Sequence, residues 1–158
     1  MSTNIELIDA GKLLLAFALG GAIGYDRERH TKDAGIRTYA AVCISSALFT
    51  FIGEQLADTA ASSRIIANII TGVGFLGAGI IYRNDKSQSS QGLTTAATIW
   101  GTSAIGVAIG LDLYIVAVVA AAALYFLLSM HHQRWYLRWK NRIAEKDAKN
   151  NKEIEERD

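Results

Sequence analysis

Five runs of apolar residues follow one another along the chain, separated by short polar stretches. They cover Leu13–Tyr25, Tyr39–Gly53, Ile65–Tyr82, Leu93–Gly110 and Leu113–Met130. A helix that crosses a bilayer needs about 17–25 mostly apolar residues. The last three runs reach that length directly; the first does so if Lys12 snorkels to the membrane surface, and the second if it extends a few residues at each end. The pattern predicts an all-α, polytopic membrane protein of about five transmembrane helices.

A soluble bundle of buried helices is the alternative interpretation of the same runs. A helix on the surface of a soluble protein normally has one polar face. Ile65–Tyr82 and Leu113–Met130 contain no charged residue at all. The membrane interpretation is therefore favoured.

Composition divides the chain into two parts. Hydrophobic residues make up 51% of the 158 residues and proline is absent, yet the mean hydropathy is only +0.19 because charge gathers in the tail. We therefore expect a transmembrane domain over residues 1–130 and a charged cytoplasmic juxtamembrane tail over residues 131–158. The net charge of +1 gives no indication of nucleic acid as a partner. The lone cysteine, Cys43, offers no cysteine-based metal site, and we expect no metal or cofactor.

The basic residues indicate an orientation. With five spans, 14 of the 16 lysines and arginines fall on one side of the membrane, and only Lys12 and Arg64 fall on the other. Short cytoplasmic segments carry the excess of basic residues. The sequence thus predicts an N-terminus outside and a C-terminus in the cytoplasm.

The third run contains the sequence TGVGFLGAG, in which Gly72 to Gly77 match the G-x-G-x-x-G spacing of a dinucleotide-binding loop. That loop needs a preceding strand and an acid about 20 residues further on, and neither is found here. On a helix, Gly72 and Gly79 share a face with Asn68, and Gly74 and Gly77 lie on another face. Small residues let membrane helices approach closely. We therefore expect these four glycines to pack against neighbours on two sides and the third helix to be central. Gly20-x-x-x-Gly24 and Gly106-x-x-x-Gly110 are common packing motifs of the same kind.

Polar residues at membrane depth are candidates for function, since they are costly there and face the protein interior. Asn68 lies in the third run, and Thr94 and Thr98 lie on one face of the fourth. Asp26 and Arg27 close the first helix at the same level as Arg37 opens the second, which predicts a buried ion-pair cluster. The candidate polar cluster is Asp26, Arg27, Arg37, Asn68, Thr94 and Thr98. Interhelical hydrogen bonding is the simpler interpretation of any single threonine.

Four sequence blocks in this order resemble the MgtC/SapB family of bacterial inner-membrane proteins. They are GYDR from Gly24, AGIRT from Ala34, RIIAN from Arg64 running into TGVGFLGAG, and GLTTAATIW from Gly92. Asp26 stands where the family usually has Glu, Asn68 where Gln is common, and Thr94 where several members carry Asn. Many relatives have an additional cytoplasmic domain, so we expect this chain to be a short form.

The resemblance implies a non-enzymatic, multi-pass inner-membrane protein linked to growth under low magnesium and, in pathogens, to survival in host cells. Its expected partners are the lipid bilayer and other membrane proteins, or a second copy of itself. The alternative is a channel or transporter for magnesium or another ion, with a polar path along the third and fourth helices. A membrane enzyme is disfavoured because no nucleophile paired with a base, metal-ligand set or phosphate loop is evident.

Overall fold

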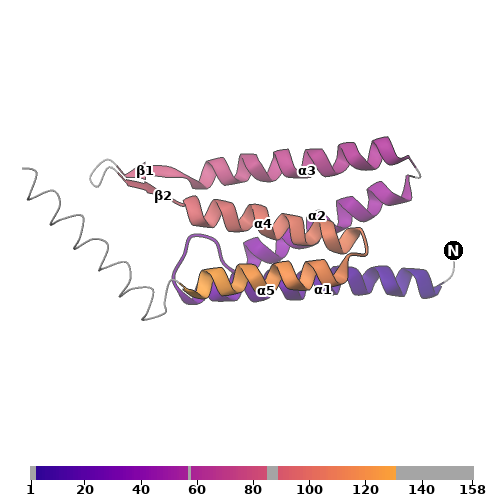
Figure 1. The fold of residues 1–158 in the computed structure, drawn as a ribbon, viewed down its shortest axis with the longest axis horizontal. Helices are drawn as coiled ribbons and strands as arrows, with labels where there is room; N and C mark the ends of the chain where they lie inside the picture. Colours follow the sequence, from indigo (N-terminus) through magenta and orange to yellow (C-terminus); the bar gives the residue numbers. More distant parts are fainter. Residues whose placement is uncertain (1–2, 57, 85–88, 131–158) are drawn as a thin grey trace, which may run out of the picture. The chain divides into compact units, whose positions relative to one another are not determined.

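The computed structural model describes residues 3–56, 58–84 and 89–130. The described residues form five helices and one short hairpin (Figure 1). The elements in chain order are α1 (Thr3–Arg29), α2 (Ile36–Gln55), α3 (Thr59–Ile80), β1 (Tyr82–Asn84), β2 (Ser89–Gln91), α4 (Leu93–Gly110) and α5 (Tyr114–Met130). The predicted five-helix, all-α fold is confirmed.

Three of these helices, α2, α3 and α4, are long and apolar enough to cross a membrane. Helix α5 is equally apolar but has 17 residues. Helix α1 begins well before its apolar run and has 27 residues. The predicted polytopic membrane protein is thus supported, while the orientation of its termini stays a prediction.

The two strands between α3 and α4 were not predicted. Tyr82 pairs with Gln91 and Asn84 with Ser89 in an antiparallel register. The Tyr82 hydroxyl also donates to the Gln91 side-chain oxygen at 2.7 Å. Gly92 follows at φ 84°, a left-handed conformation that glycine adopts without strain. This glycine turns the chain from the hairpin into α4.

Helices α2 and α4 form the centre of the bundle. Each of them packs against the other and against both α1 and α3. Only three residues of α3, Ser62, Val73 and Gly77, are buried, so α3 lies at the edge. The prediction that the third helix is central is therefore wrong. Its many glycines do not place it inside, because burial depends on which backbones meet, and those are the backbones of α1, α2 and α4.

The closest helix contacts occur at the glycines of α1 and α4. A Cβ atom added to Gly20 would lie 2.7 Å from Cys43 Cβ, and one added to Gly24 would lie 2.6 Å from Ile36 Cα. From α4, a Cβ on Gly106 would overlap the Cys43 carbonyl oxygen. No side chain fits at such distances. The two G-x-x-x-G motifs thus bring α1 and α4 into direct contact with α2.

Helices α4 and α5 form a tight hairpin through Leu111, Asp112 and Leu113. The Leu113 amide donates to the Ala108 carbonyl at 2.8 Å, and Asp112 adopts a positive φ of 62°. Leu124 of α5 lies against Gly101 of α4, within 3.0 Å of where a Cβ would be. The prediction that the fourth and fifth segments are neighbours is confirmed.

The chain divides by its internal contacts into residues 1–125 and residues 126–158. Of the second unit, only the last helical residues of α5, Phe126–Met130, are described. The predicted cytoplasmic tail, residues 131–158, lies outside the described residues. The boundary between domain and tail stays a prediction.

Candidate functional site

A buried arginine lies at the end of the bundle where α1 finishes and α2 and α4 begin. Arg27 is 7% exposed, and its Nη2 donates to the Thr95 hydroxyl at 2.5 Å. Its Nε atom is buried and has no hydrogen-bond partner in the described part of the chain. A buried charge is costly unless hydrogen bonds compensate for lost water. The hydrogen bond to Thr95 therefore offsets part of the cost of burying the Arg27 charge at this end of the bundle.

One turn further along α4, Thr98 meets Tyr39 of α2. The two hydroxyl oxygens are 2.6 Å apart, and the Thr98 hydroxyl also lies 2.8 Å from the Thr94 carbonyl oxygen. Because the Thr98 hydroxyl has a single proton to donate to that carbonyl, Tyr39 is the donor in the pair. Tyr39 also interacts with the Arg27 guanidinium. The Tyr39–Thr98 pair thus extends the polar contacts of Arg27 along the interface between α2 and α4.

Polar contacts continue between α2 and α4 toward the opposite end. Ser46 and Ser103 lie 2.8 Å apart, and Thr102 donates to the carbonyl of Thr98 at 2.8 Å. Thr50 is fully buried, and its hydroxyl has no partner among the described residues. We call these side chains the polar column: Arg27, Tyr39, Ser46, Thr50, Thr95, Thr98, Thr102 and Ser103.

The polar column lies at a closely packed helix interface. Cys43 and Thr50, on the same side of α2, lie against Gly106 and Gly110 of α4. A Cβ on Gly110 would lie 2.6 Å from Thr50 Cβ. Hydrogen bonds inside a membrane protein join helices when small residues permit close contact. In this conformation the column binds α2 to α4.

The predicted cluster of Asp26, Arg27 and Arg37 is only partly assembled. Asp26 and Arg27 are buried, but Arg37 is exposed and lines a shallow cavity with Glu28. Asp26 lies 3.6 Å from the His30 ring nitrogen, and the ion pairs of the described chain include neither arginine. The predicted buried ion-pair cluster is therefore wrong. Arg37 is the second residue of α2 and projects outward, and Arg27 binds a hydroxyl instead of a carboxylate.

Although Asn68 lines a groove with Ser46, the side chains of Asn68 and Thr94 form no hydrogen bond with the polar column. Both are exposed, whereas Thr98 is buried against α2. The polar interior of the described residues thus lies between α2 and α4, and the predicted path along the third and fourth helices stays a prediction. The direction of Asn68 could not be read from the sequence, because a helix with small residues on two faces has no obvious inner side.

The residues of α2 in the column were not predicted. Tyr39, Ser46 and Thr50 are spaced by seven and four residues, which places them on one helix face. That spacing, matched by Thr95, Thr98 and Thr102 on α4, is the signal that predicts such an interface.

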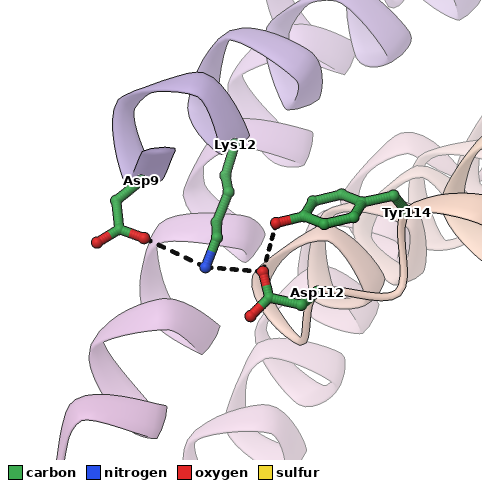
Figure 2. A network of polar contacts seen from close by, with 4 residues as sticks. All are labelled: Asp9, Lys12, Asp112 and Tyr114. Atoms are coloured by element: carbon green, nitrogen blue, oxygen red, sulfur yellow. Dashed lines mark hydrogen bonds and ion pairs between the residues drawn. The ribbon is translucent and has the colours of Figure 1, made fainter. Parts of the chain in front are cut away.

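A second polar network lies at the opposite end of the bundle (Figure 2). Lys12 of α1 forms ion pairs with Asp9 at 3.2 Å and with Asp112 at 2.8 Å, and Tyr114 donates to the same Asp112 carboxylate. The hydrogen bonds from Lys12 and Tyr114 hold the pKa of Asp112 below its usual value. Lys12 also lies 5.4 Å from the centre of the Phe51 ring. Lys12 therefore does not simply snorkel but ties α1 to the α4–α5 hairpin.

An apolar groove separates α3 from α2 along the middle of both helices. At one end α3 is held by Ser62, which donates to Glu54 at 2.5 Å, and toward the other by Gly77, which packs on Ala96 of α4. Between these points lies a groove of about 650 Å³. Its lining includes Ala41, Val42, Ser45, Phe49, Ile65, Asn68, Gly72 and Leu76.

The four glycines of α3 differ in their surroundings. A Cβ on Gly77 would lie 3.5 Å from the Ala96 side chain, whereas one on Gly72, Gly74 or Gly79 would meet nothing within 4 Å. The packing role expected for these three glycines stays a prediction.

Comparison with known sequences decides the family. Residues 13–134 match the sequence model of the MgtC family. The chain belongs to this family. Helices α2 to α5 and most of α1 lie within the matched region, as do both polar networks apart from Asp9 and Lys12.

Several curated relatives are similar over most of the described chain. An uncharacterized protein of Haemophilus influenzae is 35% identical over 150 residues, which is 89% of this chain and 62% of that protein. The putative magnesium transporter YhiD of Escherichia coli K12 is 40% identical over 131 residues, 77% of this chain and 60% of YhiD. Protein MgtC of Brucella abortus is 40% identical over 105 residues, 66% of this chain and 43% of that protein.

The chain therefore spans about three fifths or less of the length of these relatives. No solved structure matches it.

Proposed function

We propose that this MgtC family member is a non-enzymatic, multi-pass protein of the bacterial inner membrane that regulates other membrane proteins by helix contact, in adaptation to low magnesium or host stress. The observation that carries the proposal is the exposed Asn68 of α3. This amide lies on a lipid-length helix, where it lines the groove between α2 and α3. A polar group in that position indicates a partner in the membrane.

The outward position of Asn68 is costly if lipid is its only neighbour. Asn68 is the tenth residue of the 22-residue α3, so it lies roughly 14 Å from the start of a helix about 33 Å long. An amide near the middle of a bilayer finds no water to bond. Gly72 and Gly79, on the same face, leave room for another helix to approach. Both features favour a protein that binds other helices.

The link to magnesium comes from the name of one relative. The E. coli relative is named a putative magnesium transporter, and this chain covers 60% of its length. We therefore propose a magnesium-related role for this chain, exerted on membrane partners that themselves handle ions.

A second candidate function is transport of magnesium or another ion along the polar column. The unpartnered Arg27 Nε and Thr50 hydroxyl, toward the two ends of the column, favour it, because each has a free hydrogen-bonding position. Two features disfavour it. The backbones of α2 and α4 are in direct contact at Gly106 and Gly110. The column also contains no carboxylate, which a cation path usually includes.

The test measures Mg²⁺ flux and partner binding for the same variants. Purified protein in vesicles is compared with empty vesicles, as wild type, as Thr98→Val in the column and as Asn68→Leu on α3. In parallel, membrane proteins that co-purify from native membranes are quantified. The control for Asn68→Leu is Thr71→Val, since the Thr71 hydroxyl is exposed but already bonded to the Ala67 carbonyl at 3.0 Å.

We expect no flux above empty vesicles and loss of the co-purified partner in Asn68→Leu but not in Thr71→Val. Flux in wild type that Thr98→Val abolishes and Asn68→Leu preserves would instead establish transport through the column and sink the regulatory proposal.

A further inference from the structure

The outward face of α3 carries four residues that follow one line along the helix. At 100° per residue, Asn68, Gly72, Phe75 and Gly79 lie within about 60° of one another. By the same angle per residue, Gly77, which packs on Ala96, lies on the opposite side of the helix from Asn68. Phe75 is 81% exposed, more than any other large apolar residue of α3. This α3 face is therefore exposed along its length, and Asn68 and Gly72 on it also line the groove between α2 and α3.

The α3 face carries an amide that can donate and accept hydrogen bonds, but no described residue bonds to it. Asn68 forms no hydrogen bond within the described part of the chain, and it lies near the middle of the helix. Lipid tails have neither donors nor acceptors, so lipid alone leaves the amide unsatisfied. The occupant of the face must bring a polar group to the same depth.

A second copy of the chain meets this requirement by symmetry. Copies in a membrane share one orientation, so identical residues lie at the same depth when two copies pair side by side. An amide is both donor and acceptor, and two amides facing each other across a twofold axis exchange two hydrogen bonds. Any other partner would need an independently placed polar residue at that level.

The shape of the face fits the same arrangement. Gly72 and Gly79 have nothing within 4 Å of an added Cβ, which permits two α3 backbones to approach closely. The groove of about 650 Å³ between α2 and α3 is lined by Asn68 and Gly72 themselves, together with Phe49, Ile65 and Leu76 among others, so it lies at the same depth. The exposed Phe75 ring of one copy has the apolar character and the position to enter the groove of the other. Such reciprocal insertion is what an isologous interface requires.

We propose that two copies of this chain pair through their α3 faces, with Asn68 bonded to Asn68 of the partner subunit and each Phe75 seated in the other copy's groove between α2 and α3. The pairing specifies one partner for the helix contacts of the proposed function and rests on that function. Other membrane proteins as occupants are outcomes of the test.

The first experiment is cysteine cross-linking in a Cys43→Ser background, which removes the buried native thiol. Gly72→Cys places a thiol on the α3 face, and Gly74→Cys places one two residues away on another face. They are matched, because an added Cβ has open space at both positions. In native membranes treated with an oxidant, we expect a disulfide-linked dimer from Gly72→Cys and little from Gly74→Cys.

The second experiment measures the dimer directly. Labelled full-length protein is diluted in lipid vesicles and the monomer–dimer equilibrium is followed by energy transfer. We expect Asn68→Leu and Phe75→Ala each to weaken the dimer on the order of tenfold, and Thr71→Val to leave it unchanged. Circular dichroism and thermal unfolding of the monomer check that each variant folds.

A wild-type chain that stays monomeric in vesicles would overturn the pairing, as would equal cross-linking from both cysteines. Cross-linking of Gly72→Cys to a different membrane protein alone would also overturn it. That result, with Asn68-dependent co-purification intact, would leave the regulatory function standing. Loss of Asn68-dependent co-purification with the dimer intact would instead contradict the regulatory function and leave the pairing standing.

Discussion

Two sets of glycines in this protein have opposite surroundings. Gly20, Gly24, Gly106 and Gly110 lie where α1 and α4 touch α2, so closely that a single methyl group would clash. Gly72, Gly74 and Gly79 of α3 have open space beside them. The first set belongs to two common motifs, and the second to the most recognisable sequence block of the chain. The density of glycines in a helix therefore does not predict its burial.

The difference teaches that the two sets serve different steps of assembly. The glycines of α1 and α4 build the fold of one chain by permitting backbone contact of both helices with α2. The glycines of α3 contribute little to that fold. In our proposal they serve the next step, in which the folded chain meets another.

We expect the largest effect from substitutions in the first set of glycines, at the contacts of α1 and α4 with α2. Gly106→Ala places a methyl group on the Cys43 carbonyl, and Gly24→Ala places one on the Ile36 backbone. Neither backbone can shift without moving a helix, so we expect each change to lower the free energy of unfolding by about 1–3 kcal/mol. The measurement is SDS-induced unfolding in mixed micelles.

Gly72→Ala is the matched control for these substitutions. It adds the same methyl group where nothing lies within 4 Å. We expect unchanged stability or a gain of up to about 1 kcal/mol from the better helix propensity of alanine. Equal destabilisation by Gly72→Ala and Gly106→Ala would refute the distinction between the two sets.

A second prediction extends the comparison to polar side chains, buried against exposed. Thr95→Val removes the acceptor of the Arg27 hydrogen bond, and we expect a loss of about 1.5–3 kcal/mol, since the donor is a buried charge. Thr94→Val, in the preceding position but exposed, should change stability by no more than about 0.5 kcal/mol. Unfolding in the same micelles compares them, and similar losses would contradict a special role for Thr95.

The smallest effect concerns the network that ties α1 to the α4–α5 hairpin. Lys12 and Tyr114 lower the pKa of Asp112, so the folded state favours the charged carboxylate. This stabilisation is present above the ordinary carboxyl pKa and is lost as the pH falls below about 4 toward the lowered value. Asp112 is largely exposed, which makes the effect small.

The check is the unfolding midpoint measured between pH 6 and pH 3 in wild type and in Asp112→Asn. We expect wild type to lose more stability than the variant on acidification. Identical pH profiles would show that the pair with Lys12 contributes nothing to the fold.

Much of the architecture was predictable from the sequence. Four of the five apolar runs match the described helices within a few residues at most boundaries, and the α4–α5 hairpin follows from its short connection. The candidate site was less predictable. Thr98 was placed correctly on an interior face, but its partner Tyr39 was not recognised, and Arg37 and Asn68 were expected to face inward.

The sequence by itself determined the class of protein, the number of helices and the family, because apolar length and local motifs are properties of consecutive residues. Only the tertiary structure decided which helices are central, where Arg27 finds its hydrogen bond and that Asn68 is exposed. The physical reason is that a membrane helix with small residues on several faces has several ways to pack. The choice among them depends on backbone contacts between segments far apart in the chain.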